Sequence, residues 1–200
     1  MTNHNDPIIA LIIAAGASRR MGRCKAELPW QTGTTLLTYQ TTQWLQIGVT
    51  PVVVLAPHNA QLQQQLSSTC RTVINPSPER GKTSSILMGL ATIGDSWGTL
   101  AIASVDQPRP AWVYQRLLQE HSRQPWPLTV PGYRGRRGHP LLCDRCLLPA
   151  LQGIREESLG LRQIVQQYQG QTHTVEFATP LVLSDLNTPE LYERSLVLID

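Results

Sequence analysis

LIIAAGASRRMGRCK, residues 11–25, is the stretch of this sequence that decides the fold. Its apolar beginning, with Ile8 and Ile9 just before it, is typical of a strand buried on both faces of a parallel sheet. The small residues that follow let the backbone approach a ligand closely, and their N–H groups form a nest for an anion. They are Ala14, Ala15, Gly16, Ala17 and Ser18. Because Arg20 and Lys25 add two positive charges, the stretch predicts a strand followed by a triphosphate-binding loop.

Strand-like apolar runs alternate along the chain with helix-like segments. The runs span residues 8–15, 51–56, 72–75, 100–105, 128–131, 140–143 and 181–184. The helix-like segments span residues 35–45, 60–69, 84–93, 112–122, 144–152, 159–167 and 189–195. This alternation predicts an α/β fold, with a single-domain, three-layer α/β/α architecture and a mostly parallel, Rossmann-like sheet. Because ligands bind such sheets at the carboxyl ends of the strands, we expect the loops after Ala15, Asn75 and Val105 to share one crevice.

Length and charge narrow the class of protein. The 200 residues, 41% of them hydrophobic, suit one globular domain at residues 8–200 after a flexible tail at residues 1–7. A net charge of +3 is too small to hold nucleic acid, so we interpret the cluster Arg134, Arg136 and Arg137 as an attraction for a phosphorylated small molecule. No apolar run suits a bilayer span, and the chain begins without the cationic residues of a signal peptide. We therefore expect a cytoplasmic protein that binds no membrane.

Two common phosphate-binding motifs do not describe the first loop. A dinucleotide fingerprint needs G-x-G-x-x-G, and only Gly16 and Gly22 are present. Residues 81–83, GKT, supply the end of a Walker A motif, but Pro76 stands where its first glycine belongs. On spacing alone, Arg20 and Lys25 also fit an interpretation as ordinary surface charges.

The second loop, residues 75–85, reads NPSPERGKTSS. Gly81 allows an unusual backbone angle, and Ser84 or Ser85 is expected to cap the helix that follows. The N–H groups of that helix would then face a base or a ribose. A capped helix without any ligand explains the same residues equally well.

Two acidic positions are candidates for metal binding. Asp106 ends a buried strand two residues before Pro108, where a carboxylate suits a hard cation such as Mg²⁺. A turn residue before proline is the alternative. Asp185 and Asn187 precede Thr188, which is expected to be an N-cap, so a helix start alone accounts for this segment.

The pattern A-A-G-x-S-x-R-M-G-x-x-K at residues 14–25 resembles the signature loop of the MobA-like nucleotidyltransferases. Leu28-Pro29 and the run GTTLL at residues 33–37 are similar to the same family, and the resemblance extends from Ile12 to Leu191. Glu27 departs from the pattern, because that position is usually apolar, and we expect its side chain to point to solvent. The resemblance implies the fold of the nucleotide-diphospho-sugar transferases and a nucleotidyl transfer reaction.

The resemblance also assigns roles to individual residues. It implies that Arg20, Lys25 and Asp106 are catalytic, and that Asp106 and Asp185 bind Mg²⁺ with Asn187 in support. The implied nucleotide contacts are Ala14, Ala15, Gly16, Ser18, Arg20, Gly22, Lys25, Asn75, Gly81, Ser84 and Ser85. The segments RGHP at residues 137–140 and LGLR at residues 159–162 resemble family segments near the acceptor. The implied acceptor contacts are His139, Arg137 and Arg162.

Ala15 and the RGHP segment resemble the branch of the family that transfers a cytidylyl group from CTP to molybdopterin. The guanylyl branch typically has glycine in place of Ala15. This likeness implies CTP and molybdopterin as substrates, molybdopterin cytosine dinucleotide and pyrophosphate as products, and a molybdenum hydroxylase or its maturation chaperone as a partner. The alternatives are transfer from GTP or to a sugar phosphate, a non-catalytic carrier of the cofactor, and an RNA-binding domain, which the low charge disfavours.

Overall fold

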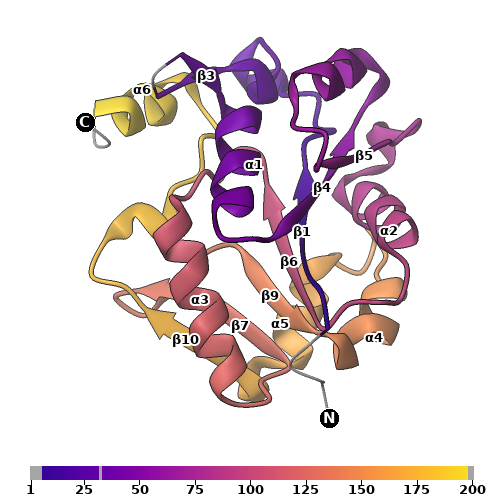
Figure 1. The fold of residues 1–200 in the computed structure, drawn as a ribbon, viewed down its shortest axis with the longest axis vertical. Coiled ribbons are helices and arrows are strands. Elements are labelled where there is room, and N and C mark those ends of the chain that lie inside the picture. Colours follow the sequence, from indigo (N-terminus) through magenta and orange to yellow (C-terminus); the bar gives the residue numbers. More distant parts are fainter. Residues whose placement is uncertain (1–5, 32, 198–200) are drawn as a thin grey trace.

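Strand β1 (Ile8–Ile13) lies near the middle of an eight-stranded sheet in the computed structural model, which describes residues 6–31 and 33–197 (Figure 1). It runs parallel to β4 (Thr50–Leu55) on one side and to β6 (Thr99–Ser104) on the other. The strand order is β10-β7-β9-β6-β1-β4-β5, and β8 pairs with β7. Strand β9 is antiparallel to β6 and β7, whereas β10 is parallel to β7 and β5 to β4. The predicted mostly parallel sheet is therefore confirmed.

The remaining strands are β5 (Arg71–Ile74), β7 (Leu128–Tyr133), β8 (Arg136–Arg137), β9 (Leu141–Asp144) and β10 (Thr172–Glu176). A separate small hairpin joins β2 (Pro29–Trp30) to β3 (Thr34–Thr35). The α-helices are α1 (Leu36–Gln46), α2 (Lys82–Ile93), α3 (Ala111–Arg123), α4 (Leu148–Gln152), α5 (Leu161–Gln167) and α6 (Pro189–Val197).

Helices cover both faces of the sheet, as the expected three-layer architecture requires (Figure 1). Successive residues of β1 point to opposite faces, so Ile12 packs in the core beneath α1 and α3 while Leu11 packs beneath α2. In the first core, the rings of Trp44 and Tyr114 stack with centroids 3.7 Å apart. In the second, a Cβ added to Gly89 would lie 2.3 Å from a methyl group of Leu11, so glycine lets α2 approach the sheet.

Three sequence-based element predictions are wrong. Residues 181–184 form part of the 3₁₀ helix η7 (Pro180–Leu183), because Pro180 fixes a helical first position and the Thr179 side chain caps it. Residues 60–69 form no α-helix; η3 (Pro57–Gln65) is a 3₁₀ segment whose glutamines offer few apolar residues to bury. Strand β10 was missed because its polar, partly exposed residues lack an apolar run.

Two other expectations concern the chain outside this core. The predicted tail at residues 1–7 lies for the most part outside the described residues, although the Pro7 carbonyl oxygen accepts a hydrogen bond of 2.9 Å from Gly98 N. Within the described ranges, no helix is both long enough and apolar enough to cross a membrane.

Candidate active site

A cavity of about 370 Å³ opens at the carboxyl ends of β1 and β6. Its walls come from the three loops that were expected to meet there, those following β1, β5 and β6, together with Asn187 from the segment before α6. The predicted site residues that line it are Ala14, Ala15, Gly16, Ser18, Lys25, Gly81, Ser85 and Asp106. The strand register explains this convergence, because Ile13 is paired with Ser104 and both chains enter their loops at the same edge of the sheet.

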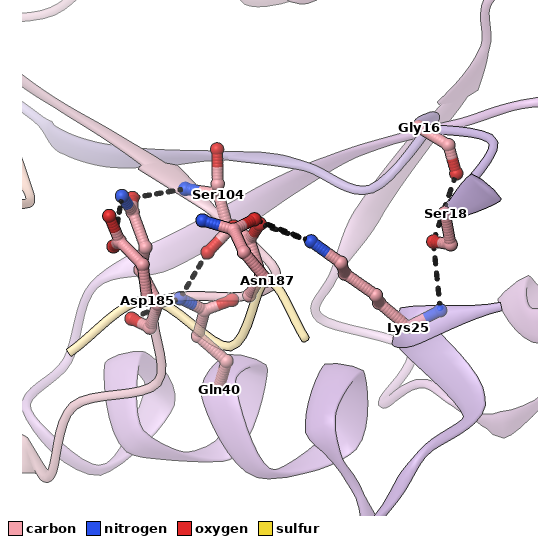
Figure 2. Close-up of polar contacts among 9 residues, drawn as sticks. Gly16, Ser18, Lys25, Gln40, Ser104, Asp185 and Asn187 are labelled. Atoms are coloured by element: carbon pink, nitrogen blue, oxygen red, sulfur yellow. Dashed lines mark hydrogen bonds and ion pairs between the residues drawn. The ribbon is translucent and has the colours of Figure 1, made fainter. Parts of the chain in front are cut away.

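The first loop curls so that Lys25 returns toward the cavity. Ser18 adopts a left-handed backbone conformation (φ 50°), and its Oγ accepts a hydrogen bond of 3.1 Å from the Lys25 backbone N–H. The same hydroxyl donates to the Gly16 carbonyl oxygen at 3.4 Å (Figure 2). Gly22 (φ 67°) turns the chain between these points but does not line the cavity. Arg20 is exposed and also lies outside the cavity wall.

The Lys25 ammonium joins two segments that are far apart in the sequence. Its Nζ lies 2.8 Å from Asp106 Oδ2 and 2.7 Å from Asn187 Oδ1 (Figure 2). The side chains of the Lys25–Asp106 pair are only 13% and 19% exposed, so water screens their attraction weakly. A carboxylate and an amide oxygen thus converge on one cation, which is the kind of donor set that Mg²⁺ accepts together with phosphate oxygens. Among the described residues, no group of three or more His, Cys, Asp or Glu side chains forms a fuller metal site.

Buried hydrogen bonds hold the loop that carries Asp106. Gln40 of α1 donates from Nε2 to the carbonyl oxygens of Ser104 (3.0 Å) and Gln107 (3.1 Å). The Asp106 carbonyl oxygen accepts from Leu186 N at 2.8 Å, which fastens the 105–107 loop to the segment before α6. Because these bonds fix the backbone on both sides of Asp106, the position of its carboxylate is determined before any ligand binds.

Asp185 takes a different place from the one that the sequence suggested. Its Oδ1 accepts a hydrogen bond of 2.7 Å from Gln107 Nε2 (Figure 2). Asp185 is not among the residues that line the cavity. Asn187 lines the cavity and shares Lys25 with Asp106. Asn187, which the sequence-based prediction gave as the supporting residue, thus shares a cation with Asp106, whereas Asp185 braces the loop; which of the two binds a metal stays a prediction.

Helix α2 starts two residues earlier than expected. It begins at Lys82 after Gly81 (φ 94°), so the prediction that Ser84 or Ser85 caps it is wrong. The side chain of Asn75 instead donates at 2.9 Å to the hydroxyl of Ser84 and, at the same distance, to that of Ser85. Asn75 and Ser84 thus support the wall from behind, whereas Gly81 and Ser85 line the cavity.

The three predicted acceptor residues come together in a second cavity of about 290 Å³. Arg137 and His139 reach it from the β8–β9 connection, and Arg162 reaches it from the start of α5. Burial foremost, together with the neighbouring positive charges of Lys82 and Arg109 and against a smaller opposing effect of Asp106, lowers the pKa of His139 from 6.5 to about 4. His139 is therefore neutral at pH 7 and offers hydrogen bonds rather than charge.

Comparison with known proteins decides the family. The model of the MobA-like NTP transferase domain matches residues 10–173, which include both cavities' main walls. The chain belongs to the MobA-like NTP transferase family. It is a nucleotidyltransferase, and its structural neighbours are nucleotidyltransferases of the nucleotide-diphospho-sugar transferase fold.

Two curated relatives of this MobA-like chain have different names. It is 29% identical to nicotine blue oxidoreductase of Paenarthrobacter nicotinovorans, over 94% of this chain and 96% of that one. It is 26% identical to molybdenum cofactor cytidylyltransferase of Escherichia coli K12, over 92% of each chain. Family membership alone therefore does not define the substrates.

Solved structures show how widely the MobA-like fold is shared. A nucleotidyl transferase from Methanothermobacter superposes with a TM-score of 0.81 at 22% identity, covering 98% of this chain and all of that one. Rv0371c of Mycobacterium tuberculosis in complex with manganese superposes with a TM-score of 0.75 at 19% identity, covering 96% and 98%. At these identities the likeness establishes the fold.

The sequence analysis missed two residues at this site, Lys82 and Gln40. It correctly predicted that Glu27, which departs from the family pattern, is exposed. Lys82 lines the first cavity, but the sequence analysis gave it no binding role of its own. Gln40 is fully buried in α1, and a lone glutamine in a helical segment gives no local signal for binding a distant loop. Glu27 is exposed, as predicted, and its carboxylate accepts a hydrogen bond from Gln61 at 3.1 Å.

Proposed function

We propose that this protein transfers CMP from CTP to the terminal phosphate of molybdopterin, with Mg²⁺, and releases pyrophosphate. The arrangement that supports the transfer is the cavity in which Lys25, Asp106 and Asn187 converge at the carboxyl ends of β1 and β6. The choice of CTP and molybdopterin follows the full-length similarity to a molybdenum cofactor cytidylyltransferase and the presence of Ala15 and the RGHP segment.

In this proposal, the first loop holds the triphosphate. The small residues Ala14 to Ser18 let backbone N–H groups reach phosphate oxygens, and Lys25 adds a positive charge at the cavity wall. Arg20 is exposed beside the loop, so in this role its long side chain folds over the phosphates when the nucleotide is bound. Together they offset the charge that grows on pyrophosphate as it leaves, which is where electrostatic stabilisation is most effective.

Asp106 and Asn187 are the residues that hold the metal in this proposal. Their oxygens already converge on a cation, the Lys25 ammonium, and the same donor types suit a divalent ion. When bound, Mg²⁺ would polarise phosphate oxygens and neutralise part of their charge. Gln40 and Gln107 brace the loop that carries Asp106 and thereby help to keep these oxygens in place.

The acceptor lies in the second cavity, beside neutral His139. Arg137 and Arg162 give that cavity the positive charge that a phosphorylated acceptor requires. A phosphate oxygen of the acceptor then attacks the α-phosphorus of CTP in line with the departing pyrophosphate. Because the nucleophile is already an anion, no covalent enzyme intermediate and no general base are needed.

The deciding experiment measures pyrophosphate release from purified protein with molybdopterin and Mg²⁺, with CTP and GTP in parallel reactions. We expect release with CTP and little with GTP. The matched control is Asp106→Asn, which keeps the shape of the side chain and removes its charge, so loss of signal in that variant assigns the activity to this site.

Other outcomes separate the alternatives. Release with GTP alone would keep the site and replace the cytidylyl assignment. Release only when a sugar phosphate replaces molybdopterin would change the acceptor class. Tight molybdopterin binding without release from either nucleotide would favour a cofactor carrier. The cytoplasmic location and a molybdenum hydroxylase or chaperone as recipient stay predictions of the same hypothesis.

A further inference from the structure

Lys82 places a second ammonium group in the wall of the nucleotide cavity. It is the first residue of α2 and lines the same space as Lys25 and Asp106. Lys25 is paired with Asp106, but no described carboxylate lies within ion-pair distance of the Lys82 ammonium, and no described residue forms a hydrogen bond with it. Lys82 therefore contributes a positive charge that the protein itself does not neutralise by contact.

The backbone around Lys82 is fastened from a distant segment. Thr83 N donates to Glu156 Oε2 at 2.9 Å, so a protein carboxylate already occupies an amide of the first helical turn. A Cβ on Gly81 would lie 2.4 Å from the Glu156 carboxyl carbon, and one on Gly160 would lie 2.8 Å from Thr83 Oγ1. These two glycines let the chain before α5 pack tightly on the start of α2. The side chain of Lys82, rather than the amide of Thr83, is thus the group left to attract an anion here.

Lys82 also influences the second cavity. Among the charged groups that act on His139, Lys82 has the largest effect, which places its ammonium within electrostatic reach of that ring. His139 lines the cavity that holds Arg137 and Arg162. Lys82 thus lines the first cavity and also acts electrostatically on a residue of the second.

We propose that Lys82 binds the phosphate group of the acceptor and positions it for attack on the α-phosphorus of the nucleotide. This inference rests on the function proposed above. In the step concerned, an oxygen of the acceptor phosphate forms a bond to the α-phosphorus. The bond from that phosphorus to the oxygen bridging the β-phosphorus breaks, and pyrophosphate leaves with the electron pair.

The charge of Lys82 addresses the main obstacle to that step. Both reactants are anions, since a phosphate monoester carries a charge of about −1.5 to −2 at pH 7 and a triphosphate carries more. An ammonium between them reduces their repulsion, and a flexible lysine stem can follow the phosphate as it approaches. In the proposed function Lys25 and the first loop, which line the same cavity, already serve the triphosphate, which leaves Lys82 for the second anion.

The kinetic test compares Lys82→Met with Arg80→Met. Arg80 is an exposed residue of the same loop, so its variant loses the same charge outside the cavity. We expect Lys82→Met to raise the KM for the acceptor about 10- to 100-fold, the loss typical of a hydrogen bond to a charged group, while the KM for CTP stays within about twofold. Lys82→Arg should restore part of the loss. An increase in the KM for CTP alone would assign Lys82 to the nucleotide, and unchanged values for both substrates would also overturn the inference.

A binding test separates this inference from the proposed function. Inorganic phosphate is titrated into protein loaded with Mg²⁺ and a non-hydrolysable CTP analogue, and binding is followed by ³¹P NMR. We expect wild type and Arg80→Met to bind phosphate alike, and Lys82→Met to bind it about 10-fold more weakly or worse. Equal binding by all three proteins, or none by wild type, would refute the role of Lys82. A wild type that binds phosphate through Lys82 but releases no pyrophosphate would refute only the proposed function.

Discussion

Acidification should destabilise this protein through one buried histidine. His121 of α3 is 6% exposed, and its Nδ1 lies 2.8 Å from the hydroxyl of Thr129 in β7. Burial lowers the pKa of His121 from 6.5 to about 4, against a smaller opposing effect of Asp144. Between these two pH values the unfolded chain binds a proton that the folded protein does not. The free energy of unfolding therefore falls as the pH falls from about 6.5 to 4.

The size of the effect follows from the two pKa values. Their difference of about 2.5, at about 1.4 kcal/mol for each pKa unit, corresponds to about 3 kcal/mol. A typical domain has a free energy of unfolding of about 5–15 kcal/mol, so this loss is large enough to measure. Above pH 6.5 both states are neutral at His121, and this residue then contributes no pH dependence.

Urea unfolding of wild type and His121→Gln at pH 7, 6, 5 and 4 measures this contribution. Glutamine keeps a hydrogen-bonding group near Thr129 but does not titrate, so the carboxylates common to both proteins cancel in the difference. We expect wild type to lose about 3 kcal/mol more than His121→Gln between pH 7 and 4. Thr129→Val, which leaves the histidine in place, should retain the wild-type slope. Parallel pH curves for wild type and His121→Gln would refute the reasoning.

Three further predictions concern the active site. Lys25→Ala should weaken binding of CTP far more than binding of cytidine in calorimetric titrations, because the ammonium serves the phosphates, and equal losses would contradict a phosphate contact. Asp106→Ala should abolish pyrophosphate release while circular dichroism and the melting transition show an intact fold, and full activity with Mg²⁺ would exclude a metal role. Asn187→Ala should weaken Mn²⁺ binding, measured by electron paramagnetic resonance, by about 10-fold or more, whereas Asp185→Asn should change it by less than about threefold. A larger loss of Mn²⁺ binding in Asp185→Asn than in Asn187→Ala would identify Asp185 as the ligand.

The parts of the fold that could be predicted are those with strong apolar patterns. β1, β4 and β6 are apolar runs buried on both faces, and their order and direction follow from the alternation with helices. η7 and β10 could not be predicted, since each depends on tertiary contacts that its own residues do not reveal. Pro180 and Thr179 stabilise one helical turn, and the partly exposed residues of β10 form a strand because β7 offers an open edge.

The site residues also divide into those whose positions follow from the local sequence and those whose positions depend on contacts with distant residues. Ala14, Ala15, Gly16, Ser18 and Asp106 could be placed in the cavity because they lie in loops that follow a buried strand. Asp185 lies outside the cavity wall and accepts a hydrogen bond from Gln107, which is 78 residues away in the sequence. No local pattern in the sequence predicts a contact between such distant side chains.

The distribution of charge supports different roles for the two lysines, with Lys25 binding the triphosphate and Lys82 binding the acceptor phosphate. Lys25 and Asp106 neutralise each other within one partly buried pair, and His139 is neutral at pH 7. Among the described charged residues that line the first cavity, Lys82 is therefore the one without a contacting partner of opposite charge. Loss of water around the ammonium lowers the pKa of Lys82, and nearby carboxylates, Asp106 foremost, offset only part of this effect. An ammonium that no carboxylate contacts keeps its hydrogen-bond donors free, which is what the capture of a second anionic substrate requires.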